Sequence, residues 1–245
     1  MPEGVPPLAA VPPGSTDADA AARRALRVQM LATEHWSLLA TRSLSWNEAF
    51  ARAGMFLSLL SGAVVALALV AQATSFGEGF VLFALLTLPV VLFVGLTTYV
   101  RLLEINNEDY FWVRGMNRLR GAYLEIDPGL APYFVTGATE DAVGIFKTFG
   151  ATEEDLNRAD WFHGFVTTPA TIGFVNSMVA AVLAATVVMQ LSMAMVSAAA
   201  VGVVAFFLTF AALGYYAFRT QTMARLTFEV PHTVQAASRQ DDSEA

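Results

Sequence analysis

The sequence predicts an all-α membrane protein in which two transmembrane helical hairpins supply four spans and cytosolic helical extensions flank them. Residues 53–100 and 169–218 contain four apolar runs of about 20 residues, the length that crosses a ~30 Å hydrocarbon core as a helix. No alternating strand pattern appears in these runs, so helices are the expected spanning form. With 56% hydrophobic residues and a mean hydropathy of +0.53, the chain is also more apolar than a typical soluble domain.

Composition excludes several kinds of function. The 245 residues include no cysteine, which excludes disulfides, thiolate metal sites and cysteine nucleophiles. A net charge of -7 argues against nucleic acid as a partner, because phosphate binding needs a dense basic face. The three histidines are far apart and lack metal-site spacing. We therefore expect no enzyme activity, no cofactor and no metal site.

The N-terminal part divides into a tail and a helix. Residues 1–15 hold half of the prolines and are expected to be disordered. Thr16 is placed to cap a helix with acids in its first turn, so residues 16–44 are predicted to form an amphipathic helix. Its aromatic and basic residues suit two environments equally, the membrane surface or the protein's own cytosolic parts.

Residues 45–100 are predicted to form the first transmembrane hairpin. Ser45 and Glu48 have the spacing of a capping box, which predicts that a new helix begins there. Trp46 is expected at the membrane interface. A turn is predicted at residues 74–79, and Pro89 is expected to kink the second span.

Residues 101–168 are predicted to form a cytosolic helical region. The second span should continue as a helix to Ile126, because large apolar residues recur at spacings of three and four apart from a gap at Asp109. The sequence of residues 127–129 should end it. We expect this apolar stripe to bury an interface, against the 16–42 helix or between subunits; it comprises Trp112, Met116, Leu119, Tyr123 and Ile126.

Two shorter helices are expected later in the central region, after threonine caps at Thr139 and Thr152. Asp160 and His163 lie three residues apart and are the best candidates for a shared proton or ion, although surface positions are the more ordinary interpretation. A basic cluster has the same two interpretations, an anion or lipid-headgroup site or a solvated face; it comprises Arg114, Arg118 and Arg120.

Residues 169–218 are predicted to form the second transmembrane hairpin, with Thr168 as the cap and Pro169 at the first helical position. Residues 219–245 should be a cytosolic tail, disordered from about residue 231. All 14 Lys and Arg residues lie outside the two hairpin turns. The positive-inside rule therefore predicts a multi-pass protein of the cell (plasma) membrane with both termini cytoplasmic.

The spans contain no Asp, Glu, Lys, Arg or His, and transporters driven by ions or protons generally need such a group at depth. The remaining polar side chains serve helix packing or line a pore; the candidates are Ser58, Ser61, Asn176 and Ser177. Asn176 is the most costly of these to place in lipid. Small residues also recur every fourth position in three spans, most persuasively in the stripes that begin at Gly54 and Gly173.

Two stretches carry a resemblance to known proteins. ATEHWSLLATRS (residues 32–43) and GMNRLRGAYLEI (residues 115–126) look like segments of a group of uncharacterised bacterial four-span integral membrane proteins. The first hairpin with its flanking helices is also remotely similar to SLATT-type two-span domains. The first resemblance implies a bacterial inner-membrane protein, and the second implies a pore-forming effector role.

Two functions follow as hypotheses. The first is a non-catalytic scaffold or accessory subunit, whose spans pack through small residues and whose cytosolic helices bind a partner. The alternative is a homo-oligomeric, weakly selective channel or pore-forming effector, because hydroxyl and amide groups can line such a pore. The expected partners are the lipid bilayer and a second copy of the chain or another membrane protein.

Overall fold

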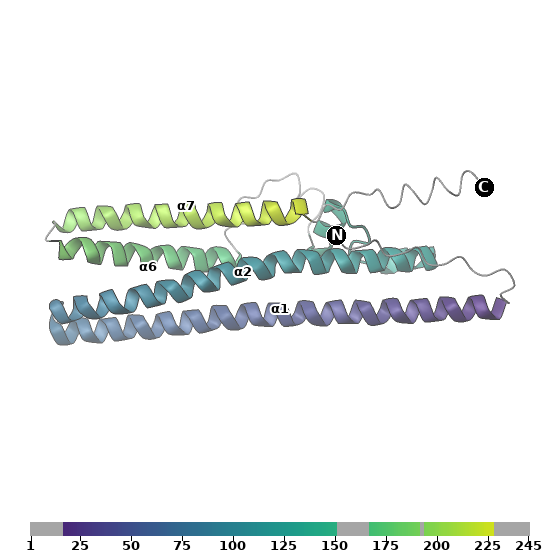
Figure 1. Cartoon of the computed structure of the whole chain (residues 1–245), viewed down its shortest axis with the longest axis horizontal. Coiled ribbons are helices and arrows are strands. Elements are labelled where there is room, and N and C mark those ends of the chain that lie inside the picture. The colour runs from purple at the N-terminus through teal and green to yellow at the C-terminus, as the bar shows by residue number, and fades with distance from the viewer. Residues whose placement is uncertain (1–16, 151–166, 192–193, 228–245) are drawn as a thin grey trace. The chain divides into compact units, whose positions relative to one another are not determined.

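The computed structural model describes residues 17–150, 167–191 and 194–227, and no strand occurs within these ranges. The elements are α1 (Asp17–Thr74), α2 (Glu78–Ile126), the 3-10 helix η1 (Pro128–Tyr133), α3 (Ala142–Thr148), α6 (Thr168–Gln190) and α7 (Met195–Thr227) (Figure 1). Each of α1, α2, α6 and α7 contains a stretch long and apolar enough to cross a membrane. They pack as two hairpins, α1 with α2 and α6 with α7. The predicted all-α class with four long apolar helices is therefore confirmed.

Helix α1 runs without a break from Asp17 to Thr74, so the predicted start of a new helix at Ser45 is wrong. The predicted capping box depended on Glu48 reaching back to a free backbone amide. In the structure the Glu48 carboxylate instead accepts hydrogen bonds from Arg52 and Arg101. The sequence around residue 45 contains no proline or glycine, so nothing local interrupts the helix.

The turn between α1 and α2 lies where the sequence predicts it. Its left-handed residues are Ser75 and Phe76, with φ of 48° and 58°, and the glycines that follow are not left-handed. The Phe76 amide donates to the carbonyl of Ala71 at 3.1 Å, which satisfies a carbonyl that the helix end leaves open. Pro89 lies inside α2, and the helix continues through it.

The predicted end of α2 at Ile126 is confirmed, and Asp127 caps η1 by accepting from the Gly129 amide at 2.9 Å. The short helix predicted after residue 139 is α3, but its cap is Asp141. Asp141 caps the helix in place of Thr139 because the Asp141 carboxylate accepts a hydrogen bond from the Gly144 amide at 2.9 Å.

Helix α6 begins at Thr168, and its cap is Thr167 rather than the predicted Thr168. The Thr167 hydroxyl accepts from the Ala170 amide at 3.4 Å, and Pro169 lies within the first turn as expected. The helix predicted after Thr152 lies outside the described residues.

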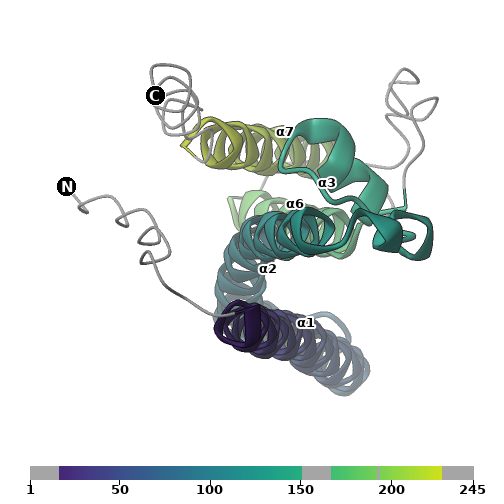
Figure 2. The same cartoon turned by 90° about the vertical axis from the view of Figure 1, so that its right-hand side faces the viewer.

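The chain divides into two compact units, and both long N-terminal helices contribute to each of them. Unit 1 comprises residues 1–42 and 112–156, and unit 2 comprises residues 43–111 and 157–245. In unit 2, α6 lies beside both α7 and α2 (Figures 1 and 2). The buried core of unit 2 draws on α1, α2 and α6, and its largest fully buried side chains include Phe56, Ile105 and Ile172.

Candidate functional site

Asn176 is one of two polar side chains in the described part of unit 2 that are 0% exposed. Its Nδ2 donates to the Ile172 carbonyl at 3.0 Å, whereas its Oδ1 has no hydrogen-bond partner in the structure. That oxygen faces Gly95 of α2: a Cβ placed on Gly95 would overlap it and would lie 2.7 Å from the Phe56 ring. Asn176 therefore occupies a junction of α1, α2 and α6 that only glycine at residue 95 permits.

The other three polar candidates do not join Asn176 on one surface. Ser177 is also 0% exposed and donates to the Gly173 carbonyl at 2.8 Å, within its own helix. Ser58 and Ser61 are exposed on α1, where the Ser61 hydroxyl donates to the Leu57 carbonyl. The structure therefore brings Asn176 and Ser177 into helix packing and leaves Ser58 and Ser61 facing outward from one chain.

Small residues bring α6 and α7 together. A Cβ on Gly202 would lie 3.2 Å from the Ala181 carbonyl oxygen and 3.3 Å from the Ala185 Cβ, so the two backbones approach closely there. A Cβ on Gly54 or on Gly62 of α1 would meet nothing within 4 Å. The small-residue stripe of the fourth span, which contains Gly202, is thus packed within the chain, whereas the stripe that begins at Gly54 in the first span is open.

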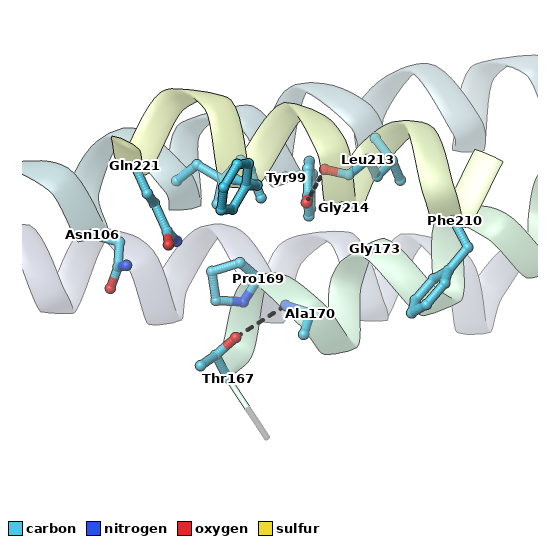
Figure 3. A pocket seen from close by; sticks show the side chains of 13 residues that line it. Tyr99, Asn106, Thr167, Pro169, Ala170, Gly173, Phe210, Leu213, Gly214 and Gln221 are labelled. Atoms are coloured by element: carbon cyan, nitrogen blue, oxygen red, sulfur yellow. Dashed lines mark hydrogen bonds between the residues drawn. The ribbon is translucent and has the colours of Figure 1, made fainter. Parts of the chain in front are cut away.

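A cavity of about 420 Å³ lies between α2, α6 and α7 of unit 2 (Figure 3). Tyr99 and Leu213 both line this cavity, and the Tyr99 hydroxyl donates to the Leu213 carbonyl at 2.8 Å. This hydrogen bond joins α2 to α7. Its lining is mainly apolar; the residues are Tyr99, Leu103, Asn106, Thr167, Pro169, Ala170, Gly173, Phe210, Leu213, Gly214, Ala217, Phe218 and Gln221. Size and lining are those of a small-molecule or lipid site.

Charged side chains join α1 to α2 in unit 2, outside the predicted spans. Arg101 donates to both carboxylate oxygens of Glu48, each at 3.0 Å, and also to Glu104 and Glu108. Hydrogen bonds from Arg101 and then Arg52 lower the pKa of Glu48 to about 2, and the same carboxylates raise the pKa of Arg101. The predicted spans end at residue 100, and this bidentate pair fixes α1 to α2 immediately beyond that point.

Trp46 and Asp109 form a second link between α1 and α2. The Trp46 indole Nε1 donates to Asp109 Oδ1 at 3.1 Å, and Asp109 is only 2% exposed. Asp109 is the residue that interrupts the apolar stripe of the sequence. Asp109 occupies a buried position because it accepts this hydrogen bond from Trp46, which lies 63 positions away. The spacing of residues around Asp109 does not predict that partner.

In unit 1, the predicted apolar stripe packs within the chain. Met116 is 1% exposed and Leu119 is 9% exposed, while Trp112 and Ile126 are half-buried. Tyr123 stacks on His35 of α1, with 6.0 Å between ring centroids, and lies 6.3 Å from the Phe134 ring. Burial lowers the pKa of His35, and the charge of Arg120 adds to that shift.

Asn117 is a buried polar centre of unit 1 that sequence reasoning missed. Its side chain is 0% exposed; Nδ2 donates to the Thr139 carbonyl at 2.9 Å, and Oδ1 accepts from Thr148 at 2.7 Å and Arg120 at 2.9 Å. These bonds hold the segment of residues 137–148 on α2. Asn117 lies within GMNRLRG, one residue from the apolar stripe, and only its tertiary partners distinguish it from a surface asparagine.

The basic cluster of α2 is only partly solvated: Arg118 is exposed, whereas Arg114 and Arg120 are half-buried. Arg114 donates to Glu140 at 3.1 Å, and Arg118 donates to both oxygens of the same carboxylate at 2.6 Å. These bonds lower the pKa of Glu140, mainly through Arg118, and raise the pKa of Arg118. Glu140 therefore pairs with two of the three arginines, and its single carboxylate offsets one of their three positive charges.

The Asp160–His163 pair lies outside the described residues, as does His232. Among the residues that the structure describes, no group of three His, Asp or Glu side chains is arranged to hold a metal ion.

Comparison with known proteins identifies no family. No protein-family model matches the chain, and neither does any curated protein or solved structure.

Proposed function

We propose that the chain is a non-catalytic membrane scaffold or accessory subunit, with unit 2 in the bilayer and unit 1 as its cytosolic helical module. The observation that carries this proposal is that the four polar candidates of the spans lie in two different environments. Asn176 and Ser177 are used in packing between helices, and Ser58 and Ser61 face outward from a different helix. One chain therefore presents no continuous polar path across its described spans, and the Asn176 Nδ2 and Ser177 Oγ donate to carbonyls within α6.

A pore between copies is the second candidate. Ser58 and Ser61 lie on the outward face of α1, together with the open glycines Gly54 and Gly62. Close packing of that face against a second copy would bring hydroxyl groups together. The layout similarity of the first hairpin to SLATT-type domains adds to this alternative.

Ion flux distinguishes the two functions. The purified chain in liposomes should give no flux above that of empty liposomes for several ions and voltages if it is a scaffold. Asn176→Leu tests the buried amide and Ser61→Leu tests the outward face. If Ser61→Leu alters the ion flux and Asn176→Leu does not, the protein is a pore between copies and the scaffold proposal is wrong. Flux that Asn176→Leu alters in a normally folded variant would place the path inside one chain.

Orientation is the second testable part of the proposal. The positive-inside rule places both hairpin turns outside and unit 1 in the cytosol. Because the chain has no cysteine, single cysteines can be introduced at Ser75 and Leu191, which are exposed at the turns, and at Val135 of unit 1, which is 87% exposed. The first two should react with an impermeant thiol reagent on intact cells, and Val135→Cys should react only after lysis. Reaction of Val135→Cys on intact cells would reverse the orientation.

A further inference from the structure

The cavity of unit 2 lies where the apolar parts of three helices end. Tyr99 comes two residues before Arg101 on α2, Phe218 directly precedes Arg219 on α7, and Pro169 lies in the first turn of α6. Arginines mark the edge of a span because charge is costly in hydrocarbon. The cavity therefore runs from the membrane boundary into the hydrocarbon region.

The lining changes in polarity along the cavity. The amides of Asn106 and Gln221 lie at one end in Figure 3, and the Phe210 ring lies at the other. Phe210 and Gln221 are about 16 Å apart along α7, at ~1.5 Å per residue. That is about half of a ~30 Å hydrocarbon core, the depth of one leaflet. No lining residue is charged.

We propose that this cavity holds one acyl chain of a diacyl phospholipid, with the ester-linked glycerol region beside Asn106 and Gln221. Amide N–H groups can donate to ester carbonyl oxygens, and the apolar end matches a hydrocarbon chain. The uncharged lining gives no preference for one headgroup charge. The site recognises the chain and its ester region, and its occupancy is independent of whether the protein is a scaffold or a pore.

An acyl chain is the apolar material present at this depth of a bilayer, and a single unbranched chain is narrow enough to enter a cavity of about 420 Å³. A helix of a second copy, about 10 Å wide, is the competing occupant, and the disulfide test below identifies it.

Gly214 provides the variant that tests this proposal. It lines the cavity, and a Cβ placed there meets nothing within 4 Å, so Gly214→Leu should fill the space without a backbone clash. Gly62→Leu is the matched control, since residue 62 also has open space around it but lies on α1, away from the cavity. Ala217→Leu is a second filling variant, to be used if Gly214→Leu alters thermal unfolding.

The full chain is reconstituted in phosphatidylcholine vesicles that contain a trace of phosphatidylcholine with a diazirine midway along one acyl chain. After irradiation, adducts mapped by mass spectrometry should concentrate on Phe210 and Leu213. Gly214→Leu, which fills the cavity, should lower the yield of adducts on Phe210 and Leu213 at least fivefold. Gly62→Leu should leave that yield unchanged. A phosphatidylglycerol probe should give the same pattern.

Three results would overturn the proposal. Adducts could be spread evenly over exposed span residues such as Phe93 and Val203, which would mean that lipid acts only as solvent. The adducts could be unchanged by cavity filling. Capture of a free fatty-acid probe but not of the phospholipid probes, or a disulfide between copies of Gly214→Cys, would assign the cavity to another occupant.

Discussion

Replacing Gly95 with alanine should destabilise unit 2 by about 1–3 kcal/mol, the usual range for overpacking a filled core. The added methyl group would overlap Asn176 Oδ1 and lie 2.7 Å from the Phe56 ring. Both neighbours are 0% exposed, so neither side chain can move aside into solvent. Gly95→Leu should prevent folding of the two hairpins together. Thermal unfolding in detergent measures the effect.

A double-mutant cycle identifies the cause. Asn176→Ala removes the overlapping oxygen, so it should recover a part of the stability lost in Gly95→Ala, with a coupling energy of about 0.5 kcal/mol or more. Gly62→Ala is the control, because a Cβ at residue 62 meets nothing within 4 Å. Equal melting temperatures for Gly95→Ala and Gly62→Ala would show that α2 and α6 do not pack as described.

Leu119→Asp should destabilise unit 1 by about 3 kcal/mol or more, because it places a carboxylate in an apolar environment. Leu119 is 9% exposed and neighbours Met116, which is 1% exposed. Hydrogen exchange should show lost protection in residues 112–126 and little change in α6 and α7. Val135→Asp, at a residue that is 87% exposed, should change stability by less than about 0.5 kcal/mol.

The apolar stripe packs within one chain in the structure, and the same variant tests that packing against the alternative of an interface between subunits. If the stripe packs against α1 in one chain, Leu119→Asp lowers the melting temperature at every protein concentration. If it packs between subunits, the variant dissociates an oligomer in size-exclusion chromatography while each chain melts as before. Indistinguishable behaviour of Leu119→Asp and Val135→Asp would exclude both.

The sequence by itself determined the four apolar helices, the turn at residues 74–79 and the end of α2 at Ile126. These features depend on local properties: the length of an apolar run, the turn residues, and proline and glycine after a helix. The same local reasoning failed at Ser45, where a capping box was predicted inside a continuous helix. A carboxylate three residues after a serine has the same local pattern whether it caps a helix or, like Glu48, binds an arginine 53 positions away.

Only the tertiary structure decided which polar residues meet. Asn176 and Ser58 have similar sequence surroundings of small and apolar residues, yet Asn176 is buried against Gly95 and Ser58 is exposed. Asn117 became a buried centre through Thr139 and Thr148, which are more than 20 positions away. The lipid cavity likewise needs three helices at once. Periodicity defines one face of one helix, whereas burial and pairing depend on which neighbour covers that face, and that neighbour is fixed by long-range packing.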